Sequence, residues 1–268
     1  MTPLAVERGN GPVILGQPHG GTFVPEEIAA TFNDNGRKLA DTDWHIWRLY
    51  DGLCDGATVV RANFHRYVID ANRDPEGQSL YPGQNTTGLC PLTDFDSEPI
   101  YQPGMEPDES EIARRIVDWH RPYHKALEAE IDRVKALHGH AIVFDCHSIR
   151  SRIPFLFDGD LPDFNIGTND GTTCDSSIER VALDICSRAK GFTHVLNGRF
   201  KGGWTTRHYG RPQDGVHAIQ MEIAQRQYMD EFAPWNWRDE RASKTRLVLK
   251  SLFIGLNAFA PQLSGARS

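Results

Sequence analysis

The amino-acid sequence predicts a single α/β domain, and three observations support this fold class. Short apolar runs rich in β-branched residues alternate with stretches of helical periodicity, which is typical of helices packed on a sheet. The chain has 268 residues, 39% hydrophobic and 24% charged, values that suit one large globular domain. No internal repeat or interdomain linker divides the sequence. We therefore expect one domain over residues 1–268, with residues 261–268 as a flexible tail.

The strands of this sheet are predicted by short apolar segments. Val, Ile and aromatic residues favour extended backbone, and the segments are too short to be helices. In chain order the predicted strands are residues 12–15, 57–62, 67–69, 141–144, 155–157, 193–196 and 218–223.

The helices are predicted by apolar residues at intervals of three and four. The longest candidate has such a stripe, which we interpret as a packing face. Pro122 lies inside this candidate and should kink or break it, because proline has no backbone N–H to donate. The predicted helices are residues 25–32, 42–54, 108–137, 176–190 and 244–258.

Two long stretches have no sustained periodicity, and we expect both to be loops. Residues 72–105 are rich in Asp, Asn, Pro and Gly, and residues 198–216 are rich in Gly. Loops of this length inside a compact domain are usually functional.

Charge and composition exclude several classes of partner. The formal net charge of −7 gives no general basic field, so we expect no nucleic-acid partner. The apolar runs are far shorter than the ~20 residues that span a bilayer, so we expect no membrane partner. The first twelve residues lack the pattern of a signal peptide, which favours a cytoplasmic protein. Five cysteines without a CxxC pair indicate reduced packing residues.

Two histidines follow or end predicted strands. His19 stands in the PHGG segment after the first predicted strand, and His147 ends the segment FDCH. Strands of one sheet can bring such residues to a common edge, where open α/β sheets place their sites. Neutral imidazole is a favoured zinc ligand, and Asp145 could orient one ring through its second nitrogen. The pattern favours a metal site.

A third ligand should be a carboxylate or a histidine. Asp41 and Asp43 stand where a helix is predicted to begin. An aspartate there is often only a helix cap. If one carboxylate caps, the other is free to bind metal.

Glu222 is the single carboxylate in the apolar segment AIQMEI. An unpaired carboxylate is costly to bury, so this residue needs either a partner or a chemical role. We interpret it as a general base, with a structural ion pair to an arginine as the alternative. Cys146 adjoins His147, but neighbouring strand residues point to opposite faces, which disfavours a thiol nucleophile.

Arginines are frequent in the segments expected to be loops. Their planar guanidinium groups bind carboxylates with paired hydrogen bonds. Glycines around Trp204 and Tyr209 suggest a flap over the site. The arginines are Arg66, Arg73, Arg150, Arg152, Arg199, Arg207 and Arg211.

Many long motifs in one order resemble the N-formylglutamate amidohydrolase family, also called N-formylglutamate deformylases. The resemblance runs over residues 12–256 and implies hydrolysis of N-formyl-L-glutamate to formate and L-glutamate, in histidine degradation. It also implies a mixed sheet flanked by helices, similar to zinc carboxypeptidases and aspartoacylases. The motifs are PHGG, DTDW, HRYVIDANRDP, LYPGQNTTGLCP, DFD, FDCHSIRSRIPFLF, LPDFNIGTNDG and NGRFKGGWTTRHYGRPQDGVHAIQMEIAQRQYM.

The same resemblance suggests roles for residues. FDCHS resembles a strand that gives a zinc ligand, which matches His147, and QMEIA resembles the strand of a catalytic glutamate, which matches Glu222. The HxxE ligand pair of carboxypeptidases is absent, because Thr22 stands three residues after His19. We therefore expect His19, Asp43 and His147 to hold a divalent ion, with Zn²⁺ as first choice and with Asp43 preferred to Asp41 or Glu26.

The expected substrate is a small dicarboxylate bound by polar side chains. Asn72 and Arg73 resemble the Asn-Arg pair that binds the substrate carboxylate in the carboxypeptidase group. The alternative function is a metallocarboxypeptidase or an N-acyl-amino-acid deacylase with a larger acyl group. The further predicted substrate-binding residues are Arg150, Arg199, Arg207 and Tyr209.

Overall fold

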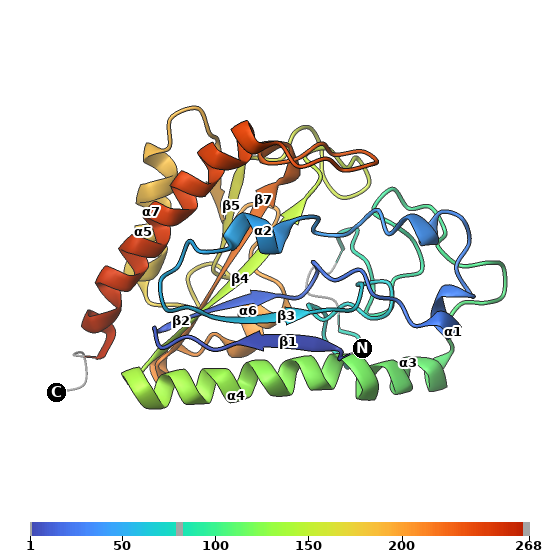
Figure 1. The fold of residues 1–268 in the computed structure, drawn as a ribbon, viewed down its shortest axis with the longest axis horizontal. Coiled ribbons are helices and arrows are strands. Elements are labelled where there is room, and N and C mark those ends of the chain that lie inside the picture. Colours follow the sequence, from blue (N-terminus) through green and yellow to red (C-terminus); the bar gives the residue numbers. More distant parts are fainter. Residues whose placement is uncertain (1, 79–82, 265–268) are drawn as a thin grey trace.

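A seven-stranded mixed sheet forms the centre of the molecule (Figure 1). The computed structural model describes residues 2–78 and 83–264. The strand order is β1-β3-β2-β4-β7-β5-β6, with antiparallel pairs β1–β3 and β5–β7 and parallel pairs elsewhere. The mixed α/β sheet is thus confirmed. The strands are β1 (Leu4–Glu7), β2 (Val13–Gln17), β3 (Thr58–Ala62), β4 (Ala141–Ile149), β5 (Phe164–Gly167), β6 (His194–Leu196) and β7 (Val216–Ala224).

Helices cover both faces of this sheet. In Figure 1, α5 and α7 lie against one face, while α3 and α4 run along the other. β2, β4 and β7 are buried along their whole length, which explains why apolar residues predominate in their sequences. The helices are α1 (Glu26–Ala29), α2 (Ile46–Tyr50), α3 (Glu109–Arg115), α4 (Arg121–His138), α5 (Ser176–Arg188), α6 (Trp204–Tyr209) and α7 (Asp239–Ser264).

The side chains of β4 alternate between two hydrophobic cores. Ile142, Phe144 and Cys146 pack into the core beneath α5 and α7. Ala141 and Val143 pack into the core beneath α4, on the opposite face. This alternation decides which polar residues at the end of the strand share a face.

Two predicted strands are wrong. Residues 67–69 and 155–157 form turns, in which Val68 N–H donates to His65 O and Leu156 N–H donates to Ile153 O. A run of three apolar residues carries too little periodicity to separate a strand from a buried turn. The segments of β1 and β5 were not predicted as strands.

The long helical segment does not break at Pro122. A π-helical turn, Ile116–His120, joins α3 to α4, and Pro122 lies in the first turn of α4. Since proline cannot donate to the carbonyl four residues earlier, the wider turn accommodates it without ending the helix.

Two other expectations need correction. Residues 198–216 are not all loop, because they contain α6 and a short 3₁₀ turn, Pro212–Asp214. Residues 261–264 are not a tail, because α7 continues to Ser264, and residues 265–268 lie outside the described part of the chain. The described residues of 72–105 form no helix and no strand of the sheet.

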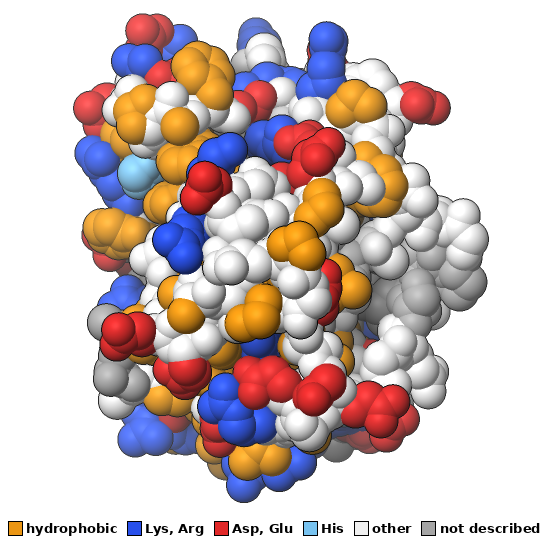
Figure 2. Space-filling model, turned by 90° about the vertical axis from the view of Figure 1, so that its right-hand side faces the viewer, with side chains coloured by type: hydrophobic (Ala, Val, Ile, Leu, Met, Phe, Trp, Pro, Cys, Tyr) orange, Lys and Arg blue, Asp and Glu red, His pale blue; other side chains and the backbone are white. Residues whose placement is uncertain are grey.

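Long loops gather at one side of the molecule, which Figure 2 shows in space-filling form. Acidic and basic side chains are interspersed on this face. Within the described residues, no helix combines the length and the apolar composition needed to cross a bilayer.

Candidate active site

Four predicted site residues come together near the carboxyl ends of β2, β4 and β7. His19 lies in the loop after β2, His147 lies in β4, and Glu222 lies beside His147 in β7. Asp43 comes from the loop that precedes α2. Because all three strands are parallel neighbours, their ends form one edge of the sheet, where α/β folds place their sites.

The two glycines after His19 let its loop pack closely on neighbouring segments. A Cβ atom at Gly21 would lie 2.4 Å from the backbone carbon of Asn63, so no larger residue fits. Asp43 N–H donates to His19 O at 3.1 Å, which joins this loop to the loop carrying the carboxylate.

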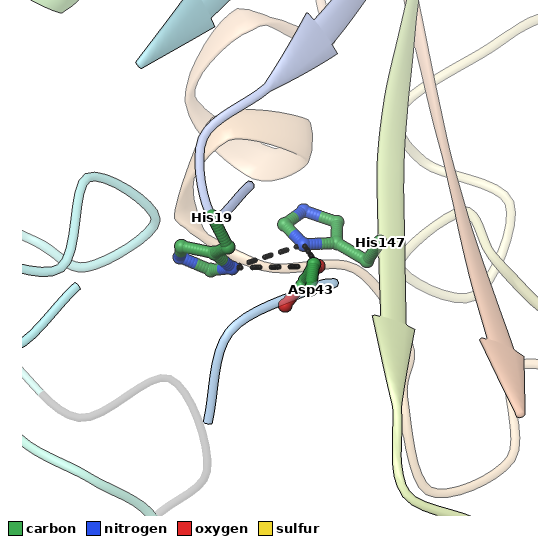
Figure 3. Close-up of side chains that lie close together, drawn as sticks. All are labelled: His19, Asp43 and His147. Carbon is green, nitrogen blue, oxygen red and sulfur yellow. Dashed lines mark hydrogen bonds and ion pairs between the residues drawn. The ribbon is translucent and has the colours of Figure 1, made fainter. Parts of the chain in front are cut away.

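His19, Asp43 and His147 point toward one another (Figure 3). The two Nδ1 atoms are 3.1 Å apart, and Asp43 Oδ2 lies 3.5 Å from Nδ1 of His147 and 4.0 Å from Nδ1 of His19. All three residues are buried. Three ligand atoms therefore converge on one point away from solvent.

A carboxylate holds the outer nitrogen of each ring. Nε2 of His19 lies 2.7 Å from Asp70 Oδ1. Nε2 of His147 lies 3.0 Å from Asp145 Oδ1 and also 3.0 Å from Asn72 Nδ2. A carboxylate favours an N–H group at Nε2, and a neutral ring in this tautomer has its lone pair on Nδ1. The Nδ1 atoms of both rings thus face the centre of the cluster.

This donor set fits a divalent ion such as Zn²⁺. Zinc binds imidazole nitrogen and carboxylate oxygen at about 2.0–2.2 Å, so the ligand atoms of a tetrahedral site lie roughly 3.3–3.6 Å apart. The three distances in the cluster bracket that value. Moreover, the guanidinium of Arg66 contacts Nδ1 of His19, so a positive group already lies against this lone pair.

Burial and neighbouring charges shift the pKa values of the three cluster residues in different directions. Burial, reinforced by Arg66, lowers the pKa of His19 to about 4. Burial also opposes a charge on His147, but Asp145 and Asp43 outweigh it and raise the pKa of His147. Burial would raise the pKa of Asp43, yet its contacts with the two histidines lower it.

The other two carboxylates considered as ligands lie elsewhere. Asp41 is buried, but it accepts hydrogen bonds from the Tyr67 hydroxyl at 2.8 Å and from Phe95 N–H at 2.9 Å. Glu26 is exposed at the start of α1. Asp43 is therefore the carboxylate that the structure brings to the two histidines.

Glu222 is buried beside the cluster. Burial, together with the charge of Asp43, raises its pKa to about 8. Gln220 donates to Glu222 Oε2 at 3.3 Å and accepts from Gly203 N–H at 2.6 Å. No arginine salt bridge to Glu222 occurs among the described residues, so the structural alternative for this residue has no support.

Cys146 points away from His147. It is fully buried in the core beneath α5 and α7, and burial raises the pKa of its thiol well above the usual value. An inaccessible protonated thiol does not suit nucleophilic catalysis.

The cluster faces a cavity of about 60 Å³. Of the predicted substrate-binding residues, Asn72, Arg73 and Arg199 line it. Arg199 also links two separate segments beside the cavity, because its guanidinium donates to Leu156 O at 2.8 Å and to Asn85 O at 2.7 Å. Arg73 is oriented by bonds to Thr87 O and Oγ1, at 2.9 and 3.1 Å.

Three predicted substrate-binding residues do not line this cavity. Arg150 pairs with Asp96 at 2.9 Å, and Arg207 Nε donates to Gly202 O. Tyr209 is buried in the core beneath α4, where its hydroxyl lies 3.1 Å from Nδ1 of His124. The glycine-rich composition indicated a flap, but it could not show which side chains of α6 would face the cavity.

Two further residues of the site were not assigned to it from the sequence, although Arg66 was among the loop arginines that the sequence singled out. Arg66, only 6% exposed, lines the cavity and contacts His19. Asp70, which holds His19, stands directly after the segment mistaken for a strand. The sequence signal that could have identified Asp70 was its position as a carboxylate directly after an apolar run.

Known proteins resemble this chain over most of its length. The sequence model of the N-formylglutamate amidohydrolase family matches residues 11–229. An N-formylglutamate deformylase of Pseudomonas aeruginosa is 46% identical over 257 residues, 96% of each chain. A protein of the same name from Pseudomonas putida is 44% identical over 260 residues, 97% of each chain.

A solved structure gives the same result. The crystal structure of an N-formylglutamate amidohydrolase from Ralstonia eutropha JMP134 superposes with a TM-score of 0.80 at 27% identity, over 98% of this chain and 99% of that chain. A structure from Agrobacterium tumefaciens, with a TM-score of 0.73 and 20% identity, has the same fold. The chain belongs to the N-formylglutamate amidohydrolase family.

Proposed function

We propose that this protein hydrolyses N-formyl-L-glutamate to formate and L-glutamate. The observation that carries the proposal is the buried cluster of His19, Asp43 and His147 with Glu222 beside it, at a cavity lined by arginines. Family membership supports the same substrate. A cytoplasmic location and a place in histidine degradation stay predictions.

His19, Asp43 and His147 would hold the divalent ion, and Zn²⁺ suits these ligands. Such an ion, when bound, polarises a carbonyl and makes a water molecule more acidic. Asp70 and Asp145 lie against Nε2 of the two rings and would favour the tautomers whose Nδ1 atoms can bind the ion.

Glu222 would take a proton from the attacking water and deliver it to the glutamate nitrogen as the amide bond breaks. The ionised form is needed for the first step. Positive charge in the cluster stabilises that form, so the pKa of Glu222 should fall below about 8 when the cluster is loaded.

Arginines in the cavity would bind the two carboxylates of the substrate. A dianion is repelled by a protein of net charge −7, so local cations must reverse the potential inside the cavity. Arg73 is our choice for the α-carboxylate, and Arg199, also in the cavity lining, for the side-chain carboxylate. Arg66 adds a third positive group next to the cluster.

The test is an assay of formate release from N-formylglutamate, with the metal content of the same preparation measured by mass spectrometry. N-acetylglutamate is the comparator, because a deacylase of broader specificity would release acetate as well. Fast release of formate alone supports the proposal. Comparable release of acetate would favour the N-acyl-amino-acid deacylase, and no turnover of either would reject both.

A further inference from the structure

Two histidines outside the cluster face the segment that carries Asn72 and Arg73. Nε2 of His120 lies 3.0 Å from Arg73 O, and Nε2 of His124 lies 2.7 Å from Ala71 O. A carbonyl oxygen only accepts, so each ring carries its proton on Nε2 and donates it. The two bonds hold the backbone on either side of Asn72.

The helix geometry explains how both rings reach this segment. His120 ends the π-helical turn and His124 lies in the first turns of α4, four residues later, so the rings share a face with centroids 4.4 Å apart. The π-helical turn changes the helical register just before α4, and such turns are frequent at functional sites. Pro122, between the two histidines, stabilises this departure from the α-helix.

Both histidines are enclosed and electrically neutral. They are 2% and 8% exposed, and Trp204 of α6 packs on them with ring centroids at 5.5 and 4.6 Å. Burial lowers the pKa of each. The Tyr209 hydroxyl lies 3.1 Å from Nδ1 of His124, so Tyr209 can act on the site through this ring.

The side chain of Asn72 is held from the other side. Its Oδ1 accepts from Thr205 N–H at 2.8 Å, and its Nδ2 lies 3.0 Å from Nε2 of His147. Gly203 packs so closely that a Cβ there would lie 2.2 Å from Asn72 Nδ2. Arg73 in turn lines the cavity. Helices α4 and α6 thus fix the backbone and one side chain of the same short segment.

We propose that His120 and His124 are positioning residues that set the carboxylate specificity of the enzyme, by fixing the backbone from which Asn72 and Arg73 reach the substrate. This inference rests on the proposed function. It predicts that the two histidines affect recognition of the α-carboxylate more than the chemical step.

The experiment replaces each histidine by phenylalanine and by glutamine. Phenylalanine keeps a ring against Trp204 but removes the donor, whereas the glutamine amide can donate to the same carbonyl. His138→Phe is the matched control, because His138 lies on the same helix and its Nε2 is 2.9 Å from Asn10 O, far along the helix from His120. Each variant is assayed on N-formylglutamate and on N-formyl-4-aminobutyrate, which lacks the α-carboxylate.

We expect His120→Phe and His124→Phe to raise KM for N-formylglutamate on the order of tenfold, the effect of one lost buried hydrogen bond, with little change in kcat or metal content. The kcat/KM for N-formyl-4-aminobutyrate should stay within about twofold. The glutamine variants should recover most of the loss, and His138→Phe should behave as wild type.

Equal losses on the two substrates would overturn the inference, because a partly unfolded enzyme loses activity on both alike. An unchanged KM in both phenylalanine variants would overturn it as well. The proposed function is judged separately, by turnover of N-formylglutamate in the wild-type enzyme.

Discussion

At the scale of single residues, the site depends on the charge that each side chain meets after burial. His19 and His147 have similar surroundings of carboxylates, yet the pKa of His19 falls to about 4 while that of His147 rises. Arg66 contributes to the difference, because it lies against His19. Neighbouring charges, and not residue type, decide which ring carries a proton before an ion binds.

The first prediction concerns metal binding. His19→Ala, Asp43→Ala and His147→Ala should each lose bound metal and activity together, since three ligands are the usual minimum for a catalytic zinc site. Metal content by mass spectrometry and formate release measure the two effects. Asp41→Asn is the control, because its amide oxygen can still accept from Tyr67, and it should keep its metal. Full activity in metal-free protein would contradict this prediction.

The second prediction separates the base from the ligands. Glu222→Gln should retain metal and substrate affinity while kcat falls roughly 10²–10⁴-fold, the usual contribution of a general base. The measurements are kcat, KM and metal content in the same preparation. Loss of metal from this variant would instead make Glu222 a ligand.

At the scale of secondary-structure elements, the parallel pairing of β4 and β7 determines which polar side chains lie side by side in the site. His147 is paired with Glu222, and Asp145 with Gln220, so four polar side chains stand in two adjacent rows. A shift of one residue would send His147 into the apolar core that contains Cys146. The continuous burial of both strands makes that shift costly.

The third prediction tests how α6 closes on the site. Gly203→Ala would place a methyl group 2.2 Å from Asn72 Nδ2, so either α6 or Asn72 must move. We expect kcat/KM for N-formylglutamate to fall at least tenfold, the effect of about 1.4 kcal/mol. Gly88→Ala is the control, because its nearest neighbour would be Cys90 O at 3.9 Å. Normal kinetics in Gly203→Ala would show that α6 does not constrain Asn72.

The sequence predicted those elements whose pattern is local. Polar residues that follow or interrupt apolar segments pointed to His19, His147 and Glu222, because burial of such residues requires a reason, and the structure brings these three residues together. It did not predict the roles of Arg66 and Asp70, since these come from an irregular segment whose contacts depend on the complete fold. The direction of α6 depends in the same way on packing between distant segments.

At the scale of the whole molecule, buried neutral histidines make folding depend on pH. Burial lowers the pKa of His217 to about 4 and lowers those of His65 and His124 well below 6.5. Between pH 6.5 and about 4 the unfolded chain therefore binds more protons at these sites than the folded protein. Their contribution to stability is complete above pH 6.5 and is lost as the pH falls. Asp41, whose pKa burial raises to about 7, acts in the opposite direction.

The fourth prediction isolates one of these groups. His217 accepts from Asp175 N–H through Nδ1 at 3.1 Å, and the side-chain oxygen of His217→Asn can take that bond. Asparagine does not titrate, so the variant lacks the contribution of the His217 imidazole. As the pH falls from 6.5 to 4, its free energy of unfolding should therefore fall less steeply than that of the wild type, and the slopes should differ by up to about 1.4 kcal/mol per pH unit. Urea unfolding at several pH values measures the slopes. Parallel curves for the two proteins would contradict the assignment to His217.

The two backbone hydrogen bonds of Arg199 have a consequence for turnover. Its bonds to Leu156 O and Asn85 O join separate segments beside a small cavity. We expect the exit of a large product to require these segments to move apart. Formate is much smaller than glutamate and needs less opening. We therefore expect an ordered exit, with formate departing first and glutamate remaining as the species that competes with the next substrate molecule.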